Sequence, residues 1–207
     1  MVNDDTKEQG SLSEIDSWTG GFSWIAYPEE RGKRASHALL TEGGVWLVDP
    51  VDVDGLDERV AKLGNVTGVL VLQDRHTRDA AEVARRHDVA VFIPEWMTLA
   101  REKLDAEAEP VGSNLPGSNY TVHRLIERKD WEEAVLVDET TKTLVVPEAI
   151  GTLPSFGKND TELGVHPSVD EPPHKLADWN PDRILVGHGT SVHDDANRQL
   201  RAALDVE

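Results

Sequence analysis

Apolar and polar residues follow one another along this chain in short runs, which predict a succession of strands and short helices. Single strands are predicted over residues 68–72, 90–93 and 183–186, because each run is short and rich in valine, leucine or isoleucine. Two hairpins are predicted over residues 38–48 and 134–146. Helical spacing of apolar residues favours helices over residues 55–63, 80–86, 95–107 and 194–204.

The order of these elements indicates the fold class. A hairpin comes first, strand–helix units follow, and then a second hairpin and strand–helix unit appear, which fits an αββα sandwich of the α/β class. We expect one domain over residues 18–207, preceded by a flexible lead-in over residues 1–17. Residues 151–181 contain glycine and proline without clear periodicity. A loop of that length is usually functional, partly structured or misassigned.

The charge of the chain limits its partners. Lysine and arginine number 21 against 39 aspartate and glutamate residues, which gives a formal net charge of −18. Nucleic acid and membrane surfaces are excluded as partners because they need clustered positive charge, so a small-molecule substrate or ligand is expected. The acidic residues are dispersed, which is typical of a solvated surface in a salt-rich cytoplasm. We therefore predict a thermal midpoint that rises steeply from about 0.1 M to a few molar KCl.

The absence of cysteine restricts the chemistry of any metal site. Disulfides, iron–sulfur clusters and thiolate zinc sites are excluded. A metal would need histidine, aspartate or glutamate ligands. No apolar run approaches the roughly 20 residues of a membrane span. The polar N-terminus has no signal-peptide core, so a soluble, cytoplasmic protein is expected.

The segment richest in candidate chemistry is the loop after the strand 68–72. It contains Asp74, His76 and Asp79, followed at once by a predicted helix. Imidazole and carboxylate groups bind zinc, iron or manganese. Structural roles explain the same residues equally: His76 can hydrogen-bond to a nearby aspartate, and Asp79 with Glu82 can form a capping box for the helix.

Two further polar residues follow apolar strands. His188 lies between two glycines after the strand 183–186, and Glu148 follows Pro147 at the end of the second hairpin. Strand ends at one edge of a sheet share a crevice, so we predict that His76, Glu148 and His188 converge within roughly 10 Å. His166, in the long loop, is a further residue that could reach this place.

These segments together resemble the metallo-β-lactamase fold superfamily. Its loop His-x-His-x-Asp-His aligns with residues 74–79, where His76 keeps a histidine and Arg78 stands in place of the aspartate. Residues 187–189 match the family's Gly-His-Gly element, and its bridging aspartate maps onto Glu148. Its middle histidine would fall near residues 128–131, where there is none. The resemblance covers roughly residues 35–195 and looks like a divergent haloarchaeal branch with a degenerate metal-binding motif.

The resemblance implies a metal-dependent hydrolase, in which a metal ion lowers the pKa of the attacking water. It implies metal ligands drawn from His76, His188, Asp74, Asp79 and Glu148. One of the carboxylates of Asp74, Asp79 or Glu148 could instead be the general base. We expect at most one divalent metal ion, with iron or manganese favoured over zinc, because carboxylates replace histidines here.

Two arginines in the loop support an alternative. Arg75 and Arg78 would repel a nearby dication unless they face outward or pair with Asp74 and Asp79. The alternative is a non-catalytic member of the same fold that binds no metal and acts as a binding or structural protein. An arginine here could also bind an anionic group of a substrate.

Overall fold

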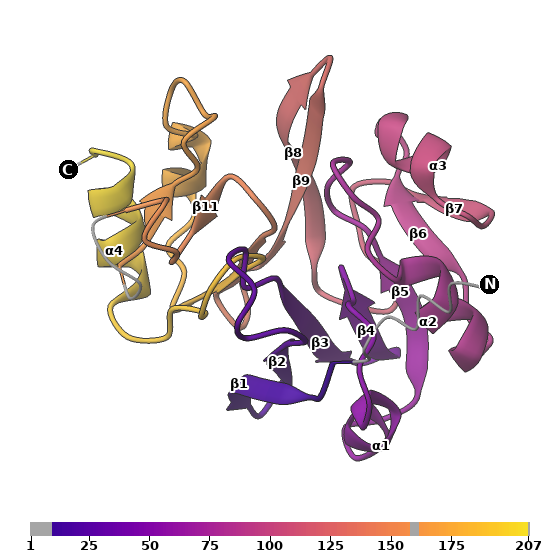
Figure 1. Ribbon diagram of the computed structural model, residues 1–207. Helices are drawn as coiled ribbons and strands as arrows, with labels where there is room; N and C mark the ends of the chain where they lie inside the picture. The colour runs from indigo at the N-terminus through magenta and orange to yellow at the C-terminus, as the bar shows by residue number, and fades with distance from the viewer. Residues whose placement is uncertain (1–9, 158–161, 207) are drawn as a thin grey trace, which may run out of the picture.

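Two β-sheets form the centre of the computed structural model, which describes residues 10–157 and 162–206 (Figure 1). The larger sheet has seven strands in chain order, namely β1 (Ser13–Trp18), β2 (Gly21–Ile25), β3 (Ala35–Thr41), β4 (Gly44–Val48), β5 (Val66–Leu70), β6 (Val91–Pro94) and β7 (Ala108–Val111). The smaller sheet has four strands in the order β13 (Arg183–Val186), β10 (Thr143–Val146), β9 (Trp131–Asp138) and β8 (Thr121–Arg128). A short ribbon joins β11 (Ile150–Gly151) to β12 (Gly164–Val165).

Helices lie on the outer sides of the two sheets (Figure 1). The larger sheet is accompanied by α1 (Leu56–Ala61), α2 (Ala80–His87) and α3 (Leu99–Lys103). The smaller sheet is accompanied by α4 (Ala196–Ala203) and the 3-10 helix η1 (His174–Asp178). This arrangement is the predicted αββα sandwich.

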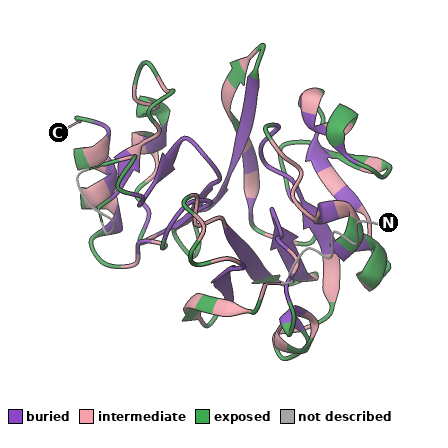
Figure 2. Ribbon diagram, viewed as in Figure 1, coloured by how far each residue is buried: buried purple, intermediate pink, exposed green. Residues whose placement is uncertain are grey.

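Alternation of side chains along the smaller sheet explains the layers. In β9, Ala134 and Leu136 pack into the same core cluster as β4 and β5, whereas Val135 and Val137 pack into a second cluster with Leu200 of α4. Successive residues of a strand point to opposite faces of its sheet. One face of the smaller sheet therefore packs against the larger sheet and the other against α4. Figure 2 shows the result, with buried strands inside and exposed helix surfaces outside.

The two sheets meet at one edge, where the polar loops lie. Beyond the end of β5, the backbone amide of Ala134 donates to the carbonyl oxygen of Leu72 at 2.7 Å, and an isolated bridge joins Gln73 to Glu133. In the smaller sheet β10 and β13 are parallel, with Val146 opposite Val186. The residues after these two strands therefore emerge side by side.

Most elements predicted from the sequence are present. Both hairpins form, as β3–β4 and β9–β10, and the strand 183–186 coincides with β13. The predicted helix 80–86 corresponds to α2. The helix predicted over 95–107 is shorter than expected: α3 covers Leu99–Lys103, and the edge strand β7 begins at Ala108. The strand β8 was not predicted, because its apolar residues are few and irregularly spaced.

Two regions differ from their predicted character. The expected flexible lead-in contains β1, which pairs antiparallel with β2, so residues 13–17 are part of the sheet. Residues 1–9 of that lead-in lie outside the described part of the chain. The long loop holds β11, β12 and η1. In the described residues, none of the helices is long and apolar enough to cross a membrane.

Candidate metal centre

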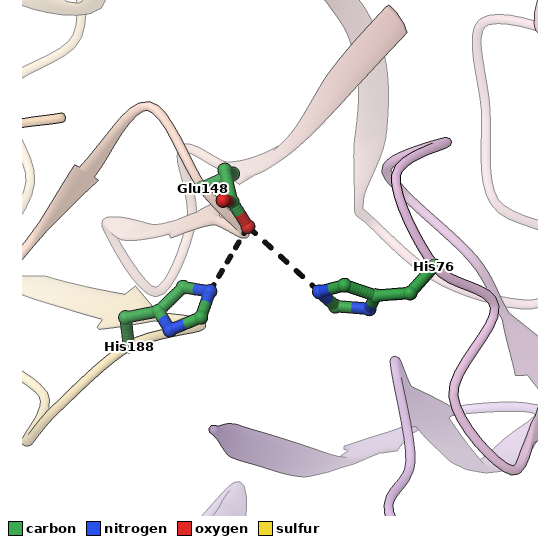
Figure 3. A group of neighbouring side chains, drawn as sticks. All are labelled: His76, Glu148 and His188. Carbon is green, nitrogen blue, oxygen red and sulfur yellow. Dashed lines mark hydrogen bonds and ion pairs between the residues drawn. The ribbon is translucent and has the colours of Figure 1, made fainter. Parts of the chain in front are cut away.

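Three of the residues predicted to converge do so. One ligand atom from each of His76, Glu148 and His188 lies within 4.8 Å of the others, which confirms the predicted convergence. Figure 3 shows the carboxylate of Glu148 between the two imidazole rings. Its Oε2 atom is 2.9 Å from Nε2 of His188 and 4.0 Å from Nε2 of His76.

His188 is held in one orientation by the backbone. Its Nδ1 atom is 2.7 Å from the carbonyl oxygen of Gly32, which can only accept, so Nδ1 carries a proton and donates it. The lone pair of Nε2 in the neutral ring would then face the carboxylate oxygen of Glu148 at 2.9 Å. Two acceptors at that distance require a proton or a cation between them. This arrangement, with two imidazoles and one carboxylate as donors, fits a divalent metal ion.

His76 projects into the site from the loop after β5. The buried amide of Gln73 lies against its ring: the amide nitrogen is 2.8 Å from Nδ1 and 3.1 Å from Nε2 of His76, and it donates to the His76 carbonyl oxygen. Burial and the charge of Arg78 lower the pKa of His76 to about 4. The imidazole is therefore neutral at pH 7, as a metal ligand must be.

Glu148 is ionised despite its burial. Burial alone would raise its pKa, but the hydrogen bond from His188 and the charges of His188, His76 and His166 outweigh it and lower the pKa to about 2. Its second oxygen, Oε1, faces away from the ligand pair: it lies 3.4 Å from Nη1 of Arg75 and 3.6 Å from Nε2 of His166. The two oxygens thus have different neighbours.

Glu133 fixes the turn that carries Glu148. Its Oε1 accepts hydrogen bonds from the backbone amides of Glu148 and Ala149 at 3.0 and 2.9 Å, and the indole of Trp131 donates to Oε2 at 2.9 Å. Burial raises the pKa of Glu133 to about 8, although these donors oppose the rise. Sequence analysis missed both Glu133 and Gln73: Glu133 lies inside β9 with partners distant in sequence, and Gln73, although it follows the predicted strand 68–72, has a side chain that is not a usual metal ligand.

Two of the predicted ligands, Asp74 and Asp79, do not join this group. The buried Asp74 accepts a hydrogen bond from the backbone amide of Glu132 at 2.8 Å, which joins the two sheets. Asp79 precedes α2 as predicted, but it makes no side-chain cap hydrogen bond. Its Oδ2 instead accepts from the backbone amide of Asp52 at 2.9 Å, so the predicted capping box is wrong.

Arg78 has a structural position that the sequence did not suggest. It does not pair with Asp74 or Asp79. Its guanidinium donates to three backbone carbonyl oxygens, those of Ala35, Asp49 and Gly187. Its backbone adopts φ of 50°, in the left-handed region that non-glycine residues rarely occupy. Arg78 therefore links the larger sheet to the residue preceding His188.

Comparisons with known proteins agree on the fold. No protein-family model matches the sequence, and no curated protein matches it. A structure of the metallo-β-lactamase DIM-1 exposed to ceftazidime superposes with a TM-score of 0.70 at 14% identity, covering 96% of this chain and 99% of that one. The metallo-β-lactamase TMB-1 gives 0.69 at 14% identity, covering 94% and 97%. A metallo-β-lactamase from Pontibacter korlensis gives 0.67 at 12% identity, covering 95% and 100%. The chain has the metallo-β-lactamase fold.

Proposed function

We propose that this protein is a metal-dependent hydrolase that holds a single divalent ion with His76, Glu148 and His188. The observation that carries the proposal is the contact between His188 and Glu148. Nδ1 of His188 donates to Gly32, so Nε2 of the neutral ring and the Glu148 carboxylate are two acceptors 2.9 Å apart, which need either a proton or a cation between them. An ion that accepts lone pairs from both, and from the nearby ring of His76, resolves this opposition.

One ion is proposed in place of a pair, because a buried arginine lies close to the site. The charge of Arg78 lowers the pKa of His76, and the charge of Glu148 acts on Arg78. A second dication beside this guanidinium would experience strong repulsion, since charges separated by little solvent are poorly screened. Asp74 and Asp79 are also engaged with backbone amides. The donors that remain suffice for one ion.

The chemistry of hydrolysis divides between the ion and the protein. A divalent ion bound here would act as a Lewis acid and lower the pKa of a water molecule. The protein orients the donors: Gln73 places the ring of His76, Gly32 fixes His188, and Glu133 holds the turn of Glu148. His166 lies on the opposite oxygen of Glu148 and accepts from the backbone amide of Ser168 through Nδ1, so a neutral His166 presents its proton to Glu148.

The donor set also favours particular ions. Two imidazole nitrogens and one carboxylate are found in catalytic zinc sites, but the same set is typical of non-haem iron sites, and carboxylate oxygen favours harder ions such as manganese. We therefore propose iron or manganese ahead of zinc. The substrate is proposed to be a small molecule, and the cytoplasm remains the predicted location.

A second candidate function rests on a different contact. The ion pair between Arg75 and Glu148 places a cationic group at the carboxylate without any metal. A protein that keeps this pair permanently would be a non-catalytic member of the fold, acting in binding or as a structural protein. The same test separates the two candidates.

The test is elemental analysis of protein purified in high salt without chelator, after growth with iron, manganese or zinc supplied in turn. Wild type should contain one equivalent of one metal, and His76→Ala should contain almost none. His123→Ala is a matched control, because His123 packs on Trp179 and is not in the metal-ligand group. The same preparations would be assayed against ester, thioester and phosphodiester substrates.

Two results would contradict the proposal. Two equivalents of zinc per chain would show that Arg78 and the carboxylates do not prevent a metal pair. No metal in the wild type, together with a loss of only about 0.5–3 kcal/mol in the free energy of unfolding for His76→Ala, would favour the non-catalytic candidate.

A further inference from the structure

Arg75 stands beside the candidate metal centre with most of its hydrogen-bonding capacity unused. Its guanidinium has five N–H donors, and one atom, Nη1, lies 3.4 Å from Oε1 of Glu148. Across residues 10–157 and 162–206 this is the acceptor found for the Arg75 side chain. The side chain is 38% exposed, whereas that of Glu148 is 9% exposed. Arg75 therefore lies between the buried carboxylate of Glu148 and the solvent.

A second arginine shares the same aromatic ring. The guanidinium carbon of Arg75 lies 4.8 Å from the ring centroid of Trp131, and that of Arg128 lies 5.0 Å from it. Trp131 is buried and its indole is anchored by Glu133, so it is a rigid support for both cations. The Nε atom of Arg128 is buried and has no hydrogen-bond partner within the described part of the chain.

This gathering of cations is unusual for the chain as a whole. The protein carries a net charge of −18, and most of its surface would repel an anion. Among the described residues, the two arginines form ion pairs with the buried Glu148 and the exposed Asp170, which lies 3.5 Å from Arg128. A metal ion on Oε2 would offset the negative charge of Glu148 and so weaken the ion pair that Arg75 makes with Oε1.

We propose that Arg75, supported on Trp131 beside Arg128, binds an oxyanion group of the substrate, either a carboxylate or a phosphoryl group. This inference rests on the proposed hydrolase function and adds its substrate class. A guanidinium binds such groups through two parallel N–H donors, which a point charge cannot do. Arg75 is then a specificity-determining residue: it orients the anionic end of the substrate while the hydrolysed bond lies at the metal.

The first experiment measures the binding of inorganic phosphate and of acetate to the metal-loaded protein by isothermal titration calorimetry. Arg75→Gln should weaken binding of the preferred anion by about tenfold to a hundredfold, the range for loss of hydrogen bonds to a charged group. Arg75→Lys should recover only part of it. The control is Arg124→Gln, because Arg124 also packs on a tryptophan, Trp96, and pairs with a glutamate, Glu127.

A metal-free arm keeps this test independent of the metal centre. Glu148→Gln removes the charge that holds Arg75, so the anion should bind this variant more tightly than metal-free wild type. Glu148→Gln with Arg75→Gln should lose that gain. Metal content, measured separately, reports on the proposed function and not on the anion site.

The outcomes are distinct. Loss of anion binding with Arg75→Gln, in either arm and with normal thermal stability, supports the anion site. Tighter binding of phosphate than of acetate indicates that the substrate carries a phosphoryl group, and the reverse order indicates a carboxylate. Equal affinity of wild type and Arg75→Gln for both anions, or equal affinity of Glu148→Gln and the double variant, overturns the inference even when a metal is bound.

Discussion

The loop after β5 and the strand ends of the smaller sheet contribute to the same site, but they use their polar residues differently. In the loop, Asp74 and Asp79 bind backbone amides and Arg78 binds backbone carbonyls, so only His76 and Arg75 face the site. At the strand ends, Glu148 and His188 face each other and the site. The loop therefore serves mainly to join the sheets, whereas the strand ends keep the donors for a ligand.

The largest expected effect on stability comes from the removal of Arg78, which tests whether the loop after β5 joins the two sheets. Arg78→Met should lower the free energy of unfolding by about 2–4 kcal/mol, because three buried carbonyl groups each lose a charged donor. It also removes the charge that most strongly opposes the rise in the pKa of Asp49, which burial raises to about 6. Urea denaturation measures the change. Arg124→Gln should stay within about 0.5 kcal/mol. A loss of under 1 kcal/mol for Arg78→Met would show that the loop does not join the sheets as described.

The effect of salt on stability should differ between the acidic surface and the buried hydrogen bonds of Arg78. The thermal midpoint of the wild type should rise by about 5–10 °C between 0.1 M and 3 M KCl, because salt screens repulsion among the dispersed acidic residues. The destabilisation caused by Arg78→Met should stay constant over the same range, since its hydrogen bonds are buried. Differential scanning calorimetry checks both. A flat midpoint in the wild type would leave the acidity of the chain without a role in salt tolerance.

His37 provides a test of pH dependence inside the larger sheet. This buried histidine lies 2.8 Å from the hydroxyl of Ser23, and burial, together with the charge of Arg78, lowers its pKa to about 3. As the pH falls below 6.5, the unfolded chain takes up a proton at His37 and the folded protein does not. The free energy of unfolding should therefore fall between pH 6.5 and 3, by at most about 1.4 kcal/mol per pH unit from this residue.

The variant His37→Asn isolates that contribution. It should be less stable than wild type at pH 7 but should lose less stability on acidification to pH 5. Urea denaturation of both proteins at pH 7, 6 and 5 gives the slopes. If the free energies of unfolding of the two proteins fall equally with pH, proton uptake at His37 in the unfolded chain is not a cause of the loss of stability.

The smallest expected effect concerns the strand ends. In the metal-free protein a proton lies between Nε2 of His188 and Glu148, so a metal that binds both must displace it. Metal affinity should therefore rise about tenfold per pH unit while that proton is bound. Calorimetry in buffers with different ionisation enthalpies counts the protons released. Release of none would argue that the ion does not contact His188, and His188→Gln should abolish any release seen.

The layers of the fold and the convergence of three side chains could be predicted from the sequence alone. The apolar runs of β9, β10 and β13 are local signals, and the ends of parallel strands emerge at one edge of a sheet. Because Glu148 and His188 follow those strands directly, their meeting was predictable. His76 follows β5 in the other sheet, and it meets them because the two sheets join beyond the end of β5.

The roles of the remaining polar residues could not be predicted, because they depend on contacts that form only in the tertiary structure. Asp74, Asp79 and Arg78 look like a damaged metal-binding motif in the sequence, but their partners are backbone groups of Glu132, Asp52 and Gly187, which lie far away along the chain. Glu133 and Trp131 gave no signal for the same reason. A buried polar group must find a partner, and packing, not local pattern, determines which group is within reach.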